Sequence, residues 1–165
     1  MANKLYNLSV LTQNCNSFNI STLDNPDNSL NRFKQKMFSL LETKSDIIFL
    51  QDIRAGDKCW SIEQLFTVNP LACYRCFFNS TKSSRGVMIC IKNTLDCQVI
   101  REFKNPDQNS IFLEAIVRGM RMILGSIYAP TQIKDRDFFV KIKNELETFN
   151  NLPFICGGGH ERSMR

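Results

Sequence analysis

The sequence has few of the residues that mark membrane, secreted or zinc-binding proteins. It contains one histidine and one tryptophan among 165 residues. No apolar run approaches the roughly 20 residues that a membrane-spanning helix requires. Residues 1–14 also lack the basic leader and the apolar stretch of a secretory signal. We therefore expect an intracellular protein, nuclear or cytoplasmic, that is neither secreted nor associated with a membrane.

The cysteines number seven, an odd count that does not fit a framework of disulfides. Several lie inside apolar runs, as Cys90 and Cys156 do, which is typical of buried free thiols in a reducing compartment. Cys73 and Cys76 form one C-x-x-C pair. A zinc site of this kind needs a second pair, and the single histidine, His160, is far along the chain. The pattern therefore favours core thiols over a zinc site.

The overall composition is that of one globular domain. Hydrophobic residues make up 43% of the chain and charged residues 22%, which argues against disorder. The net charge of +5 is compatible with a polyanionic partner, although a solvated basic surface explains it equally well. Charge alone therefore leaves both alternatives open.

Apolar periodicity predicts two longer helices and eight strands. The helices are expected over residues 29–43, with Asn28 or Ser29 as the N-cap, and over residues 135–149, with a shorter helix over 61–68. The strands are expected at residues 5–14, 46–51, 73–78, 86–93, 97–103, 110–118, 120–130 and 152–158. Strand runs between helices within one domain predict an α+β fold. In it, two packed, mostly antiparallel sheets are flanked by helices, as an α/β/β/α sandwich.

Four short motifs follow one another at the ends of the predicted strands. The segment QNCN (residues 13–16) ends the first strand, and FLQD (49–52) ends the strand after the first helix. SRGVMI (84–89) opens a hairpin strand, and IYAP (127–130) ends a later one. The last predicted strand then carries FICGG (154–158). The order of these motifs is more specific than any one of them.

This series resembles the endonuclease/exonuclease/phosphatase superfamily, and the R-G-V and I-Y-A-P versions look most like the endonucleases of non-LTR retrotransposons. The resemblance covers residues 5–158 and corresponds to about the first half of the family's domain. It implies hydrolysis of DNA phosphodiester bonds with Mg²⁺ or Mn²⁺. Such chemistry needs a hard cation beside the phosphate and a water activated by a carboxylate.

The resemblance also assigns roles to individual residues. By position, Asn14 would orient the metal or its water, and Asp52 would bind the metal where the family has glutamate. Tyr128 would reach the scissile phosphate from the Y-A-P turn. The same residues also have ordinary explanations, because Asn14 suits a turn cap, Asp52 a helix cap or surface charge, and Tyr128 a rim position. The order of the motifs favours the functional interpretation for these three.

Four further residues are candidates for contact with DNA. Lys82, Arg85 and Lys92 flank the predicted hairpin and would contact backbone phosphates. Thr131, just after Tyr-Ala-Pro, stands where a polar residue in contact with a phosphate or base is expected. For the three basic residues, solvated charge on an edge hairpin is the favoured alternative, since such charge also deters aggregation.

Two departures from the family pattern weaken the expected activity. Asp52 is shorter than glutamate by one methylene, which removes about 1.5 Å of reach, and Mg²⁺ tolerates poor geometry badly. The family continues Gly-Gly with Asp-x-Asn, whereas here Gly157 and Gly158 precede GHERSMR (159–165). We therefore expect residues 1–158 to be the N-terminal part of the domain and residues 159–165 to be a divergent tail.

These departures predict a truncated relative of a retrotransposon endonuclease that is weak or inactive, with impaired metal binding and a sandwich incomplete in its C-terminal half. The alternative is a non-catalytic module that binds nucleic acid or protein with the same fold. Apolar faces left uncovered by a missing half would also promote self-association.

Overall fold

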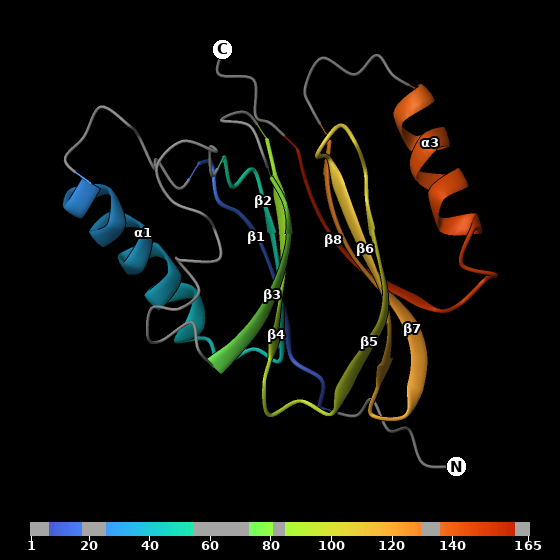
Figure 1. Cartoon of the computed structure of the whole chain (residues 1–165), viewed down its shortest axis with the longest axis horizontal. Helices are drawn as coiled ribbons and strands as arrows, with labels where there is room; N and C mark the ends of the chain where they lie inside the picture. Colours follow the sequence, from blue (N-terminus) through green and yellow to red (C-terminus); the bar gives the residue numbers. More distant parts are fainter. Residues whose placement is uncertain (1–6, 18–25, 55–72, 81–84, 130–135, 161–165) are drawn as a thin grey trace.

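The structure is a computed structural model, and it describes residues 7–17, 26–54, 73–80, 85–129 and 136–160. In these residues the chain forms two four-stranded sheets that pack face to face, with a helix on the outer face of each (Figure 1). The predicted α+β sandwich of two mostly antiparallel sheets flanked by helices is confirmed.

The first sheet has the strand order β1-β2-β4-β3. Its strands are β1 (Val10–Asn14), β2 (Ile47–Gln51), β4 (Val87–Lys92) and β3 (Tyr74–Asn79). β1 runs parallel to β2, while β4 is antiparallel to both of its neighbours. The C-terminal ends of β1 and β2 therefore lie side by side, next to the N-terminal end of β4.

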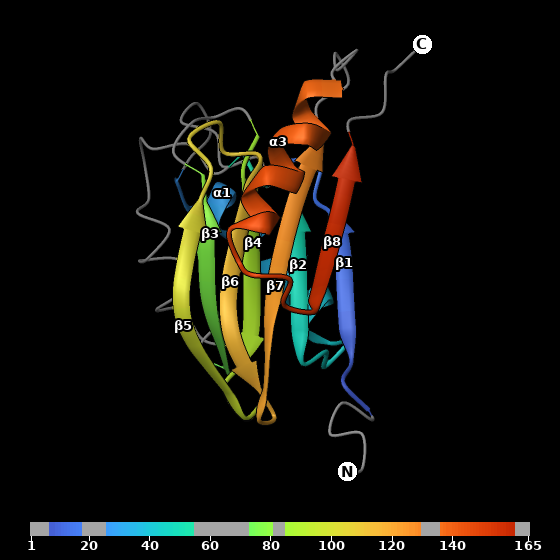
Figure 2. The same cartoon turned by 90° about the vertical axis from the view of Figure 1, so that its right-hand side faces the viewer.

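The second sheet has the order β5-β6-β7-β8. It consists of β5 (Cys97–Lys104), β6 (Ser110–Val117), β7 (Met120–Ala129) and β8 (Phe154–His160). β7 and β8 are parallel and the other pairs antiparallel. The arrowheads of β2, β7 and β8 point to the same end of the molecule (Figure 2). Two parallel strand pairs thus bring four C-terminal strand ends to one edge of the sandwich.

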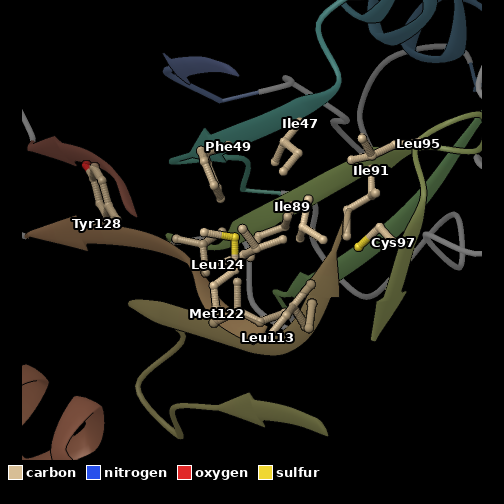
Figure 3. Packing of buried hydrophobic residues seen from close by; sticks show 14 residues of the cluster. Ile47, Phe49, Ile89, Ile91, Leu95, Cys97, Leu113, Met122, Leu124 and Tyr128 are labelled. Atoms are coloured by element: carbon tan, nitrogen blue, oxygen red, sulfur yellow. The ribbon is translucent and has the colours of Figure 1, made fainter. Parts of the chain in front are cut away.

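The core between the sheets comes from the alternation of side chains along the strands. β2 is buried over its whole length, with Ile47 and Phe49 facing the second sheet and Ile48 and Leu50 facing α1. Tyr128 lies at one end of the inter-sheet core, beside β8 (Figure 3). Burial of each such large side chain contributes roughly 1.5–3 kcal/mol. The buried residues of this core are Ile47, Phe49, Val87, Ile89, Ile91, Leu95, Cys97, Ile111, Leu113, Ala115, Val117, Met122, Leu124 and Tyr128.

The two helices cover the outer faces of the sheets (Figure 1). α1 (Pro26–Leu41) packs Met37 against the outer face of the first sheet, and α3 (Arg136–Glu147) packs Phe138 and Ile142 against the second. α1 begins at Pro26, so the predicted N-cap at residue 28 or 29 is wrong. Proline suits the first turn because its missing N–H has no helical partner there and its φ is already helical.

The predicted order of elements is otherwise confirmed in the described residues, with two points to add. β8 continues through His160, because Gly159 and His160 pair with Tyr128 and Ala129 of β7. The short helix expected over residues 61–68 lies outside the described residues. Residues 161–165 also lie outside them.

The six cysteines in the described part of the chain are free thiols, as predicted. Cys76 and Cys90 face each other across β3 and β4, with 3.2 Å between their sulfur atoms. No cluster of three or more His, Cys, Asp or Glu side chains among the described residues is able to hold a metal ion. No helix within the described ranges has the length and apolar character needed to cross a membrane.

Candidate functional site

The ends of β1, β2 and β4 are tied together by backbone hydrogen bonds. The Cys15 N–H donates to the Gln51 carbonyl at 2.8 Å, and the Ser17 N–H donates to the Asp52 carbonyl at 2.8 Å. On the other side, the Arg54 N–H donates to the Arg85 carbonyl at 2.8 Å. The chain leaving β2 is therefore held between the chain leaving β1 and the chain entering β4.

Asp52 sits in this held segment and is bound by a neighbouring arginine. Its side chain is 3% exposed, and both carboxylate oxygens accept hydrogen bonds from Arg54. Arg54 Nε donates to Oδ1 at 2.7 Å, and Nη2 donates to Oδ2 at 3.0 Å. This two-point contact is the strongest arrangement that a guanidinium and a carboxylate make. The carboxylate is thus already neutralised by a cation of the same chain.

Backbone conformation aims the two side chains at each other. Asp52 has φ 54° and Arg54 has φ 45°, both in the left-handed region that non-glycine residues seldom adopt. Such a residue costs on the order of 1–3 kcal/mol and persists where its surroundings fix it. Here the hydrogen bonds to Ser17 and Arg85 fix it. The segment is therefore a preformed turn that presents Asp52 to Arg54.

The second sheet reaches this site through Tyr128. Hydrogen bonding to Asp52 is the largest cause that raises the pKa of Arg54, and the nearby Tyr128 side chain adds to it. Tyr128 is 1% exposed, so it is not the ordinary rim residue of the alternative explanation. Arg54 thus binds Asp52 at the end of the first sheet and interacts electrostatically with Tyr128 of the second. We call Asn14, Asp52, Arg54, Arg85 and Tyr128 the strand-end site.

A buried glutamine joins the two sheets directly beneath this site. Gln51 is fully buried, and its Nε2 donates to Ser126 Oγ of β7 at 3.1 Å. Ser126 Oγ in turn donates to the Leu50 carbonyl of β2 at 3.0 Å. These bonds satisfy polar groups that would otherwise be costly to bury. They also fix β7, and with it Tyr128, relative to the end of β2.

Two glycines allow the close approach of the chains. A Cβ on Gly157 of β8 would lie 2.7 Å from Thr12 Oγ1 and 2.8 Å from Phe49 Cγ, so only glycine lets β8 pack this tightly on the first sheet. Gly86 has φ +108°, and a Cβ there would lie 2.8 Å from Ile53 Cγ1. These contacts explain the glycines of two of the motifs in physical terms.

Asn14 ends β1 directly opposite Gln51, at the edge where Asp52 lies. Its Oδ1 accepts a hydrogen bond from the Asn16 N–H at 3.0 Å, so the turn-capping role proposed as an alternative is present. A hollow of about 290 Å³ beside it is lined by Gln13, Asn14, Cys15, Lys36, Ser39 and Leu40. The structure therefore brings Asn14, Asp52 and Tyr128 to the same edge of the sandwich, as the motif order predicts.

The structure places the predicted DNA-contacting residues Arg85 and Lys92 at opposite ends of β4. Arg85 is exposed and next to Arg54 through the backbone hydrogen bond. Lys92 lies at the opposite end of β4, a strand that extends over roughly 16 Å. There its Nζ donates to the Lys44 carbonyl at 3.3 Å. Lys82 and Thr131 lie outside the described residues. Arg85 therefore belongs to the strand-end site and Lys92 does not.

The donor groups of the strand-end site do not fit a divalent metal as they are arranged. Mg²⁺ takes oxygen ligands at about 2.0–2.1 Å in a near-ideal octahedron, with one or two carboxylates from the protein. Asp52 is the carboxylate placed for this, and both of its oxygens are engaged by Arg54. As arranged in the structure, Asp52 therefore has no free oxygen to offer a divalent metal.

Arg54 and Gln51 are the residues of this region that sequence reasoning missed. Arg54 stands two positions after Asp52, a spacing that in extended chain places both side chains on one face. That spacing was the available signal. Gln51 belongs to the FLQD motif, but its link to Ser126 spans two sheets and leaves no local pattern.

No family model and no curated protein matches this sequence. Solved structures do match its fold. The endonuclease domain of TRAS1, a telomere-specific non-LTR retrotransposon, is 15% identical at a TM-score of 0.55, over 90% of this chain and 57% of that one. An endonuclease/exonuclease/phosphatase family protein from Bacteroides thetaiotaomicron is 10% identical at a TM-score of 0.61, over 92% and 62%. TDP2 of D. rerio, complexed with single strand DNA product, is 14% identical at a TM-score of 0.58, over 96% and 61%.

The chain spans 57% to 62% of the length of these three structures. Identities of 10% to 15% show a shared fold, while activity requires its own argument from the site. The resemblance predicted from the four motifs is confirmed at the level of the fold. Over the part that its 165 residues span, the protein has the fold of the endonuclease/exonuclease/phosphatase superfamily.

Proposed function

We propose that the protein is a relative of the retrotransposon endonucleases that binds the DNA backbone at the strand-end site and cleaves it weakly or not at all. The observation that carries the proposal is the meeting of Asn14, Asp52 and Tyr128 at one edge of the sandwich, with Arg54 bound to Asp52 there. The three residues come from three separate sequence motifs, and a shared site gives a reason for them to meet.

Binding of a phosphate is supported by the groups that reach solvent. Asp52 and Tyr128 are buried, whereas the Arg54 side chain is 33% exposed and Arg85 is exposed beside it. The accessible part of the site is therefore cationic. Arginine suits phosphate oxygens because its planar guanidinium offers several N–H donors in a fixed arrangement. The solved D. rerio TDP2 complex, which shares the fold, contains single strand DNA product.

Weak cleavage is supported by the state of Asp52. A working site would use Mg²⁺ or Mn²⁺ near Asp52, with Asn14 orienting the metal or its water, and would need an accessible carboxylate. Here the carboxylate is buried and bound at both oxygens. In the proposal, Arg54 and Arg85 hold the phosphate, and Tyr128 acts through Arg54 as a positioning residue.

A binding module without any chemistry is the second candidate, and the Asp52–Arg54 ion pair favours it over an efficient enzyme. Both candidates share the same DNA surface, so they differ only in whether the bound strand is cut. The discriminating measurement is therefore cleavage, made on a protein already shown to bind.

Two assays test the proposal. Binding of a fluorescent single-stranded oligonucleotide is measured over a salt series with the wild type, Arg85→Ala and Lys92→Ala. We expect Arg85→Ala to weaken binding and to lower the slope of log K against log salt by about one. Lys92→Ala is the matched control from the other end of β4 and should leave both unchanged. Absence of salt-dependent binding by the wild type contradicts the proposal.

The second assay follows nicking of supercoiled plasmid with Mg²⁺ or Mn²⁺. A bound metal supplies several kcal/mol of transition-state stabilisation in a working site, so loss of its ligand would cost far more than about tenfold in rate. Because Arg54 already engages both Asp52 oxygens, we expect nicking by the wild type to stay within about tenfold of Asp52→Ala. Nicking far above the Asp52→Ala control would show an efficient metal-dependent nuclease and overturn the weak-cleavage part. Equal, undetectable nicking would select the binding module.

A further inference from the structure

The cation already present at Asp52 belongs to the protein itself. Arg54 donates to both oxygens of a carboxylate that is 3% exposed. The nearby Tyr128 side chain, which is buried, also raises the pKa of this guanidinium. A single positive group therefore binds Asp52 and interacts electrostatically with Tyr128, the two most deeply buried side chains of the strand-end site. That is the position at which an external cation would have to bind.

The local backbone keeps this arrangement in place before any ligand binds. Residues 52 and 54 both have positive φ. The turn is held because Ser17 N–H donates to the Asp52 carbonyl, while the N–H groups of Ile53 and Arg54 donate to the carbonyls of Gly86 and Arg85. The fold thus fixes the direction in which the Asp52 side chain leaves the backbone, and its carboxylate meets Arg54 there. For Asp52 to take part in an octahedral site, at least one oxygen must leave Arg54. Only the molecules in which an Asp52 oxygen has left Arg54 are able to bind the metal. The smaller this fraction is, the weaker the apparent metal affinity becomes.

We propose that Arg54 is the resident cation of the strand-end site and excludes divalent metal from Asp52, so that the site is preorganised without a metal ion. Arg54 is therefore a positioning residue that sets the cation preference of the site. The inference rests on the proposed function for the identity of the site, while its geometry stands independently. It predicts that removal of one guanidinium creates metal affinity.

The test measures Mn²⁺ binding through paramagnetic broadening of amide signals in the ¹⁵N-labelled protein. The variants are Arg54→Met, Arg54→Lys, and the double variant Arg54→Met with Asp52→Asn. For the wild type, we expect no saturable broadening around residue 52. Arg54→Met should bind Mn²⁺ at least about tenfold more tightly than the wild type. Arg54→Lys should be intermediate, because lysine keeps the charge without the two-point contact. The double variant should lose the gain, because it lacks the Asp52 carboxylate.

Three outcomes would overturn the inference. One is tight, saturable Mn²⁺ binding at Asp52 in the wild type. Another is a gain in Arg54→Met that persists in the double variant, since the metal would then be bound elsewhere. The third is a folded Arg54→Met variant whose stability changes without any gain in Mn²⁺ affinity, which would leave Arg54 a purely structural role.

A measurement on the wild type alone guards against a variant that fails to fold. A ligand that binds only the folded state raises the melting temperature. We expect added MgCl₂ to shift the melting temperature no more than NaCl of equal ionic strength does, and a clear excess shift would contradict the inference. Failure here is separable from failure of the proposed function, because salt-dependent DNA binding does not require the metal result.

Discussion

The contact between Asp52 and Arg54 is stable enough to be measured in a double-mutant cycle. The perturbations are Asp52→Asn, Arg54→Met and the double variant, compared with the wild type. Asp52→Asn keeps the shape of the carboxylate but removes its charge, and Arg54→Met keeps an unbranched apolar stem without the guanidinium. The coupling energy isolates the interaction between the two side chains from their separate effects on stability.

The expected magnitude follows from burial and geometry. A hydrogen bond to a charged group contributes about 1.5–3 kcal/mol, and Arg54 makes two to a carboxylate that is 3% exposed. Solvent reaches the guanidinium, whose side chain is 33% exposed, and screens the charge. We therefore expect a coupling energy of about 2 kcal/mol, below the roughly 3–5 kcal/mol lost when a fully buried pair is broken.

The assay is urea unfolding followed by circular dichroism, with the free energy of unfolding extrapolated for each protein. The matched control is the same cycle on Lys143 and Glu147, an exposed pair one helical turn apart on α3 with side chains 75% and 58% exposed. That pair should couple by about 0.3–0.5 kcal/mol. A coupling for Asp52 and Arg54 no larger than the control would refute the claim that the site is built around this ion pair.

Two further predictions concern packing and the thiols. Gly157→Ala should lower the free energy of unfolding by about 2 kcal/mol, because the added Cβ collides with Phe49. Gly158→Ala is the control: its Cβ would meet nothing within 4 Å, so the free energy of unfolding should change by less than about 0.5 kcal/mol. Urea unfolding of both variants measures the two changes. Burial raises the pKa of the Cys15 thiol to about 12, so iodoacetamide should label exposed Cys73 before Cys15. Labelling of Cys15 should accelerate about tenfold per pH unit as its thiolate fraction rises. If mass spectrometry finds Cys15 labelled as fast as Cys73 at pH 8, the burial of Cys15 is contradicted.

The architecture was predictable because its signals are local. The fully apolar run of β2 indicates a strand covered on both faces, and the structure buries Ile47 through Gln51 completely. The order of strands and helices in the chain then limits the fold to packed sheets with helices outside. Asn14 and Asp52 end neighbouring parallel strands, which explains why their sequence positions were enough to place them together.

The content of the site was less predictable because it depends on contacts between distant segments. The turn at Asp52 is fixed by backbone hydrogen bonds with Ser17, Arg85 and Gly86. These partners lie in other segments of the chain and are not encoded in the FLQD motif. Sequence reasoning consequently treated Asp52 as a metal ligand, without considering Arg54 as its partner. The spacing of two residues was visible, but the left-handed backbone that lets the guanidinium meet both oxygens was not.

Arg85 and Lys92 lie apart for a simpler reason of length. Arg85 precedes the six-residue strand β4 and Lys92 is its last residue, so the extended strand carries Lys92 to the far end of the sheet. Proximity in sequence therefore did not mean proximity in space. An estimate of the strand's length, together with the direction of β4 against β2, would have separated them.

The most direct test of the account is a map of amide chemical-shift changes on addition of a short single-stranded oligonucleotide at low salt. The account predicts that the changes concentrate at Asn14, Asp52, Arg54, Arg85 and Tyr128, without added metal, and that the end of β4 at Lys92 stays unaffected. Changes centred on Lys92 or on the outer face of α3, with the strand-end site silent, would contradict it.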